Sequence, residues 1–118
     1  MTETSKQEPA IIVTKAYDLV IWLLPKVERF PRSYRISVGD RLVSSGLDLL
    51  TSLVQASYAN DKAGLLQGAS LQANTVRYLL RLAKDLKLVT VEAYAFSTAH
   101  AEAIGRMVGS PEYQCDTV

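Results

Sequence analysis

Three basic residues in the second half of the chain have a spacing that could bind an anion. Arg77, Arg81 and Lys84 are separated by four and three positions, which on an α-helix places them within an arc of about 60°. Only Asp85 adds an acid to this row. Like charges at such spacing destabilise an isolated helix by a few tenths of a kcal/mol, so a sequence selected only for stability would mix signs. Two interpretations remain open: a solvated outer face, or a face that binds an anion.

A second basic stretch, LLPKVERFPRSYRISVGDRL, spans residues 23–42. Its five bases are Lys26, Arg29, Arg32, Arg35 and Arg41, opposed only by Glu28 and Asp40. Pro25 and Pro31 indicate a corner between two helices. We expect Lys26 on the polar side of the first helix, Arg29, Arg32 and Arg35 in the connecting loop, and Arg41 on the polar face of the next helix. Arg32, Arg35 and Arg41 therefore join the row at 77–84 as candidate nucleic-acid contacts.

The charge along the chain also favours an anionic partner. Residues 10–109 hold twelve bases and eight acids, although the whole chain carries a net charge of only +1. The two ends are acidic, so the folded part is basic.

Other reactive groups are sparse. The one histidine, His100, falls on the apolar side of its helix, which favours a packed role over a chemical one. The one cysteine, Cys115, lies near the end of the chain, so no intrachain disulfide can form, which is typical of a cytoplasmic protein. Residues 105–109 lack the strand and the Gly-Lys-Ser/Thr ending of a phosphate loop. We therefore expect no catalytic site, no metal, no cofactor and no small-molecule substrate.

Helical periodicity runs through nearly all of the sequence and predicts an all-α fold. We expect helices over about 10–28, 37–58, 61–88 and 91–108, with connections of about eight, three and two residues. Ser37 with Asp40, Asn60 or Asp61, and Thr90 are the expected N-terminal caps, and Gly109 is the expected terminating glycine. Such short connections favour an antiparallel up-down-up-down four-helix bundle over residues 10–109. Residues 1–9 and 110–118 are expected to be flexible tails, and the apolar run 10–24 is too short to span a bilayer.

The apolar arcs are wider than a single bundle needs. On the helix over 61–88 the arc exceeds half the circumference, whereas a stripe a little over 100° wide is usual. Trp22 lies off the main apolar arc of the first helix, so it is either an anchor in a protein interface or a platform for a stacked base. We favour the interface, and expect Trp22, Tyr78 and Leu82 to contribute to an oligomer or partner contact.

Several short motifs, in this order, resemble one known family. They are Tyr17-Asp18-Leu19, Trp22-Leu23-Leu24-Pro25, Phe30-Pro31-Arg32, Gly39-Asp40-Arg41, Arg77-Tyr78-Leu79-Leu80-Arg81-Leu82-Ala83 with Asp85-Leu86, and Ile104-Gly105-Arg106-Met107-Val108-Gly109. Over residues 15–109 the chain is similar to the Avd proteins, the accessory variability determinants of diversity-generating retroelements. One departure is Ser110-Pro111, where family members often have a glycine and a tryptophan.

The resemblance implies a homopentameric barrel with a basic surface and no catalytic activity. It also implies binding to the reverse transcriptase of the retroelement and to template RNA or cDNA, in support of mutagenic retrohoming. The alternative is a four-helix-bundle interaction module like the proteins encoded in intervening sequences of 23S ribosomal RNA genes, with no reverse transcriptase partner. A neighbouring reverse transcriptase gene and adenine-rich template repeat would distinguish the first from the second.

Overall fold

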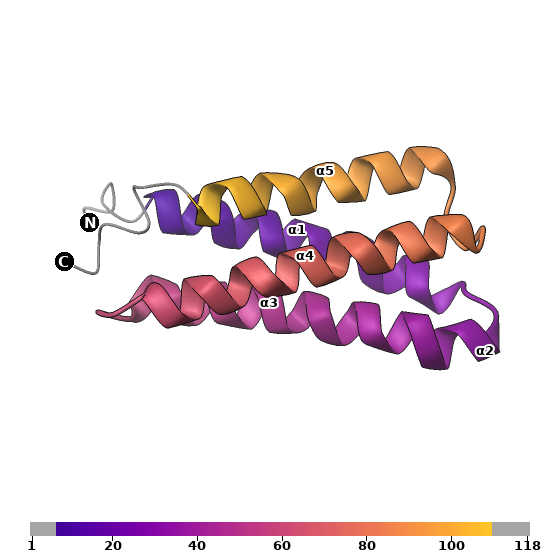
Figure 1. Ribbon diagram of the computed structural model, residues 1–118, viewed down its shortest axis with the longest axis horizontal. Helices are drawn as coiled ribbons and strands as arrows, with labels where there is room; N and C mark the ends of the chain where they lie inside the picture. The colour runs from indigo at the N-terminus through magenta and orange to yellow at the C-terminus, as the bar shows by residue number, and fades with distance from the viewer. Residues whose placement is uncertain (1–6, 110–118) are drawn as a thin grey trace.

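Four long helices form an antiparallel bundle (Figure 1). The computed structural model describes residues 7–109, and the helices are α1 (Gln7–Glu28), α3 (Asp40–Tyr58), α4 (Ala63–Asp85) and α5 (Val91–Val108). Each helix packs against two others, in the order α1, α3, α4, α5 and back to α1. The predicted all-α, up-down-up-down topology is confirmed, and the side formed by α1 and α3 lies opposite the side formed by α4 and α5. Residues 7–9, expected in the N-terminal tail, are helical in α1, whereas residues 1–6 and 110–118 of the expected tails, with Cys115, lie outside the described range.

One apolar stripe of each helix forms the core. The large side chains with less than 2 % of their surface exposed include Leu19 of α1, Leu49 of α3, Leu80 of α4 and Ile104 of α5. Several of the buried residues on α4 and α5 are small. They are Ala69, Ala73 and Ala83 on α4, and Ser97 and Ala101 on α5. Because small buried side chains let two helices pack closely, side chains beside the core on α4 can contact those on α5.

The corner between α1 and α3 is helical, which corrects the predicted eight-residue loop. A short helix α2 (Arg32–Tyr34) and a π-helical segment (Arg35–Gly39) lead directly into α3, so only residues 29–31 connect the two long helices. The carbonyl of Pro31 accepts hydrogen bonds from the amides of Tyr34 and Arg35 at 2.9 and 2.8 Å, and this starts the helix.

Ser37 is therefore not an N-cap, and the predicted capping box with Asp40 is wrong. Ser37 lies inside the helical segment, and its hydroxyl donates a hydrogen bond to the carbonyl of Ser33 at 2.9 Å. The polar sequence of residues 32–37 concealed a helix that begins as soon as Pro31 has set the chain direction.

The other helix ends follow the predictions more closely, with three corrections. Thr90 caps α5 as predicted, since its hydroxyl accepts a hydrogen bond from the amide of Ala93 at 3.0 Å. The predicted cap of α4 at Asn60 or Asp61 is wrong: Lys62 is the N-cap residue, although Asp61 accepts a hydrogen bond from the amide of Ala63 at 3.3 Å. The helix predicted to reach Leu88 ends at Asp85, because Lys87 turns left-handed with φ 63°. Gly109 follows α5 as predicted, but its φ of −79° does not require glycine.

The turn after α4 has the hydrogen bonds of a Schellman motif. The amide of Leu88 donates to the carbonyl of Ala83 at 2.8 Å, and that of Lys87 to the carbonyl of Lys84 at 2.9 Å. This turn fixes the direction in which the chain enters α5, and so it positions the basic end of α4 beside the start of α5.

Gly39 permits the close approach of the helical corner to α1. A Cβ atom at position 39 would lie 2.7 Å from Cγ1 of Val27, and the β-branched valine cannot easily rotate away. We expect Gly39→Ala to lower the free energy of unfolding by about 1–3 kcal/mol because the site becomes overpacked. Chemical denaturation followed by circular dichroism measures this change.

The matched control is Gly68→Ala. A Cβ atom at position 68 would meet nothing within 4 Å, so this substitution should raise the free energy of unfolding by about 0.5–1 kcal/mol through the better helix propensity of alanine. Equal effects of the two substitutions would contradict the packing described for Gly39.

Candidate nucleic-acid interface

All of the net positive charge of residues 10–109 lies in one half of the bundle. Arg77 faces Glu102 across the α4–α5 contact, and Gly46 faces Val20 and Leu23 across the α1–α3 contact. These two contacts mark the same level along the bundle, and residues 20–47 and 77–102 lie on one side of it. This half has nine bases and five acids, whereas the rest of residues 10–109 has three bases and three acids. We call residues 20–47 and 77–102 the basic half; it includes the end of the bundle at which α2 lies in Figure 1.

The predicted row Arg77, Arg81 and Lys84 follows the side of α4 that adjoins α5. Nη2 of Arg77 lies 4.0 Å from Oε2 of Glu102 on α5. Nζ of Lys84 lies 4.8 Å from the ring centroid of Tyr94, also on α5. The row is therefore not on the outermost surface of α4; it borders the seam between two helices.

Acids moderate this row more than the sequence suggested. Asp85 was expected to be its only acidic neighbour, and its Oδ1 does lie 3.5 Å from Nζ of Lys84. Glu102 supplies a second carboxylate from the facing helix, which corrects that expectation. The side chain of Arg81 has neither an ion pair nor a hydrogen bond with any residue between 11 and 109.

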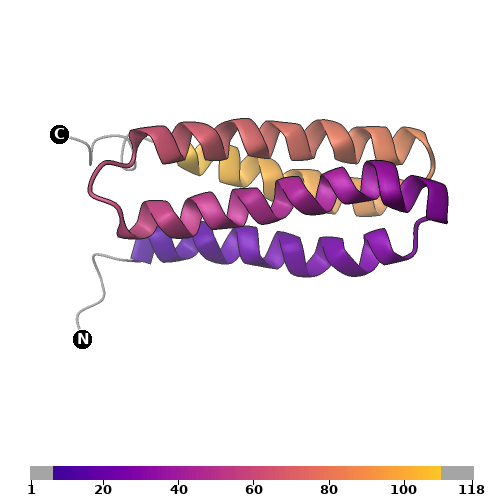
Figure 2. The same ribbon diagram turned by 90° about the horizontal axis from the view of Figure 1, so that it is seen from below.

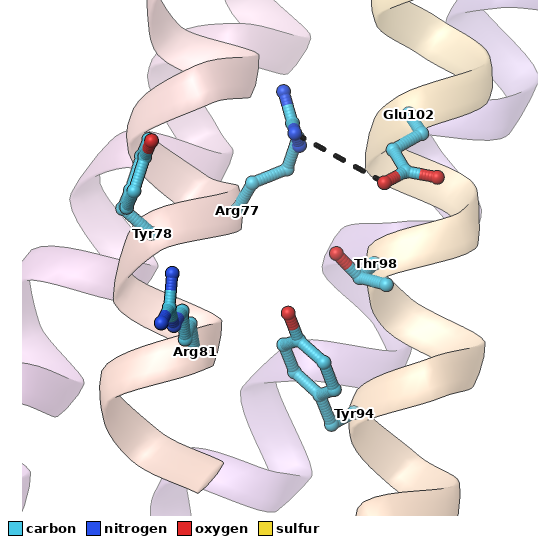
Figure 3. A pocket seen from close by; sticks show the side chains of 6 residues that line it. All are labelled: Arg77, Tyr78, Arg81, Tyr94, Thr98 and Glu102. Carbon is cyan, nitrogen blue, oxygen red and sulfur yellow. Dashed lines mark ion pairs between the residues drawn. The ribbon is translucent and has the colours of Figure 1, made fainter. Parts of the chain in front are cut away.

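A small pocket opens between the row and α5 (Figure 3). It has a volume of about 100 Å³ and is lined by Arg77, Tyr78, Arg81, Tyr94, Thr98 and Glu102. In Figure 3 the hydroxyl groups of Tyr94 and Thr98 lie in the space between α4 and α5. Sequence reasoning missed Tyr94, Thr98 and Glu102; their spacing of four residues shows that they share one face of a helix, but not that this face meets the row on α4.

The seam is hollow on both sides of this pocket. Toward the α4–α5 turn, a hollow of about 590 Å³ is lined by residues that include Lys84 and Lys87. In the other direction, a hollow of about 300 Å³ is lined by residues that include Asn74, Gly105 and Arg106. The α4–α5 seam is therefore a series of depressions bordered by cations.

The arginines of the corner lie in the same half but not in the seam. Arg32 is exposed, whereas Arg35 is half-buried and its Nη1 donates to the carbonyl of Glu28 at 3.4 Å. Arg35 therefore also neutralises the negative end of the α1 dipole. The hydrogen bond between Ser52 and Gln72 shows which residues of α3 and α4 lie opposite each other. Because the two helices are antiparallel, eleven residues before Ser52 and eleven residues after Gln72 also lie opposite each other. Arg41 is therefore opposite Ala83, in the last turns of α4.

The three predicted interface residues do not form one surface. Tyr78 and Leu82 are exposed on the outward side of α4, where Tyr78 has 68 % of its surface accessible. Trp22 is half-buried on α1, with its ring centroid 5.8 Å from that of Phe96 on α5 and 5.3 Å from Nζ of Lys26. Because α1 and α4 are not neighbours in the bundle, Trp22 lies apart from the other two.

An apolar surface that the sequence reasoning did not single out spans α1 and α3, which lie side by side in Figure 2. Its exposed members are Tyr17, Ile21, Leu24, Leu47, Val54 and Tyr58. On α1 these residues point away from the side that carries Trp22, and on α3 away from the side that carries Ser52. They therefore adjoin one another, and we call them the α1–α3 face. The signal was present in the wide apolar arcs, but one-helix patterns could not show that two exposed arcs meet.

His100 is half-buried, and its ring centroid lies 4.8 Å from that of Phe96, so the packed role expected for it is confirmed. Among residues 11–109, whose side chains the structure describes, there is no group of three or more side chains that could hold a metal ion. In the same range no helix combines the length and the hydropathy needed to cross a membrane.

Comparison with known proteins identifies a family. The family model described as bAvd-like matches residues 10–115, which includes all four long helices except the first residues of α1. No curated protein and no solved structure matches the chain.

Proposed function

The chain belongs to the bAvd-like family, and on this basis we propose that it is a non-catalytic accessory protein of a diversity-generating retroelement. It binds the reverse transcriptase of the element and handles template RNA or cDNA through its basic half, in support of mutagenic retrohoming. The observation that carries this proposal is the segregation of charge, with nine bases and five acids in one half of the bundle and equal numbers in the other.

Charge segregation on rigid helices suits a protein that contacts the nucleic-acid backbone without reading its sequence. Phosphate contacts fix position and orientation, whereas base edges specify sequence. Arg77 and Arg81 lie on one regular helix and have few partners: Arg77 contacts Asn74 and Glu102. Their positive charges are therefore available to phosphates. Each phosphate that a base neutralises contributes about 0.9 to the salt slope on a duplex and about 0.7 on a single strand.

Self-association would multiply these weak contacts. The α1–α3 face supports it: Tyr17 and Ile21 are each 55 % exposed and Tyr58 is 85 % exposed. Contiguous apolar patches of this kind are usual at protein interfaces. A ring of copies, with the homopentamer as the proposed form, would present the basic half of each copy to the same polyanion.

The alternative is an interaction module without a reverse transcriptase partner, and it assigns no function to the row Arg77, Arg81 and Lys84. A reverse transcriptase gene beside this one, together with an adenine-rich template repeat, supports the proposal, whereas a location within a ribosomal RNA intervening sequence supports the alternative.

Removal of two charges from the row should weaken nucleic-acid binding. We expect Arg77→Gln with Arg81→Gln to lower the affinity for a labelled RNA oligonucleotide by about tenfold or more, equivalent to at least about 1.4 kcal/mol. The slope of log K against log salt should flatten by about 1.4–1.8 per protomer in contact. Fluorescence anisotropy over a series of salt concentrations measures both quantities.

The matched control for the row is Lys15→Gln with Lys62→Gln. It removes the same charge from the other half of the bundle, so the salt slope should change much less. If the two double variants lose affinity equally, binding follows net charge alone and the row is not the site.

The α1–α3 face should hold copies of the chain together. We expect Ile21→Asp with Leu47→Asp to shift the mass measured by light scattering from an oligomer to a monomer, because two buried carboxylates cannot be accommodated in an apolar interface. Val91→Asp is the control: Val91 is 68 % exposed at the start of α5, outside the face, and its variant should remain oligomeric. A wild-type chain that is monomeric at micromolar concentration would contradict self-association.

A further inference from the structure

We infer that the pocket between α4 and α5 binds one phosphate group of a nucleic-acid backbone, and that Glu102 is the internal anion that this phosphate displaces. This inference rests on the proposed function and deepens it, because it assigns one phosphate site and a built-in competitor to the basic half.

The pocket gathers hydrogen-bond donors from two helices. Arg77 and Arg81 come from α4, and the hydroxyl groups of Tyr94 and Thr98 come from α5. Within residues 11–109, whose side chains the structure describes, neither hydroxyl group has a hydrogen-bond partner, nor does the guanidinium of Arg81. Four donor side chains thus line a space in which the carboxylate of Glu102 is the one anionic group among the lining residues.

A phosphodiester complements this set of donors. Its oxygens only accept hydrogen bonds, and guanidinium groups bind them with charge-assisted bonds about twice as strong as neutral ones. The volume of about 100 Å³ exceeds the roughly 10–15 Å³ that a cavity needs, on the same measure, to hold one water, so the pocket has room for a larger polar group. Donors on two facing helices surround a tetrahedral group better than a planar carboxylate.

Glu102 occupies part of this site in the free protein. Its Oε2 lies 4.0 Å from Nη2 of Arg77, and the two side chains are 46 % and 40 % exposed. Ion pairs that are this long and this accessible are weak, because water screens them. An incoming phosphate can therefore replace the carboxylate at Arg77, but the repulsion between the two anions opposes its binding. Glu102 therefore lowers the affinity of the pocket for phosphate.

The seam favours a phosphate that belongs to a polymer over a free phosphate ion. The hollows on either side of the pocket carry further cations, Lys84 and Lys87 in one direction and Arg106 in the other. A Cβ atom at Gly105 would meet nothing within 4 Å, so the backbone of α5 leaves open space beside Arg106. A chain with regularly spaced negative charges can continue through both hollows.

The test compares Glu102→Gln with Glu92→Gln. Both substitutions remove one negative charge from α5, but Glu92 does not line the pocket. The probes are labelled RNA and DNA 20-mers of one sequence, with inorganic phosphate as a competitor, measured by anisotropy on the full chain. We expect Glu102→Gln to bind both oligonucleotides at least about threefold more tightly than Glu92→Gln at the same salt concentration.

Two uncharged substitutions locate the phosphate. Thr98→Val and Tyr94→Phe each remove a hydroxyl group and no charge, so each should weaken binding about two- to tenfold without changing the salt slope. Circular dichroism of every variant confirms that the helices are intact. Equal binding by Glu102→Gln and Glu92→Gln, or unchanged binding by both hydroxyl variants, would overturn the inference.

The remaining outcomes separate the inference from the proposed function. If the wild-type chain binds neither oligonucleotide, both fail. If Arg77→Gln with Arg81→Gln weakens binding while the Glu102 and hydroxyl variants do not differ from their controls, only the inference fails. If inorganic phosphate binds but the oligonucleotides do not compete with it, the pocket is a site for a free anion. If Glu102→Gln strengthens only the binding of a protein partner, the pocket binds a carboxylate of that partner. Either result overturns the inference.

Discussion

Close packing of α4 against α5 is the interaction on which the rest of the structure depends. Small buried residues, Ala69, Ala73 and Ala83 on α4 with Ser97 and Ala101 on α5, let the two helices approach until the side chains that flank the core meet. This packing places Arg77 opposite Glu102 and Lys84 over the ring of Tyr94. A bulky residue on this line would widen the seam and separate the donors of the pocket.

The bundle keeps its charged and apolar surfaces apart. The seam that carries the row lies between α4 and α5, and the α1–α3 face lies on the opposite side of the bundle. Burial of the α1–α3 face in an assembly would therefore leave the seam accessible. Under the proposed function each protomer would make few phosphate contacts, each weak and salt-dependent, so repetition of the seam in an assembly would be the simplest way for such a small domain to bind a polyanion firmly.

Sequence reasoning succeeded where the signal is local and failed where two elements meet. The bounds of α5 and its Thr90 cap follow from a hydroxyl group beside an apolar repeat. The row at 77–84 follows from helical spacing alone. The helical corner was missed because polar side chains resemble a loop, and the early end of α4 was missed because lysine rarely adopts the left-handed conformation found at Lys87. Glu102 as the partner of Arg77 could not be found, because a wheel drawn for one helix carries no information about the facing one.

Ultraviolet crosslinking of the full chain to RNA that contains 4-thiouridine, with crosslinked peptides identified by mass spectrometry, tests the central claim most directly. The tyrosines divide between the surfaces: Tyr78 and Tyr94 line the pocket, whereas Tyr17 and Tyr58 belong to the α1–α3 face. If the basic half binds the nucleic-acid backbone through the seam, crosslinks will concentrate at Tyr78 and Tyr94 and disappear at high salt. Crosslinks that concentrate at Tyr17 and Tyr58 would contradict the account.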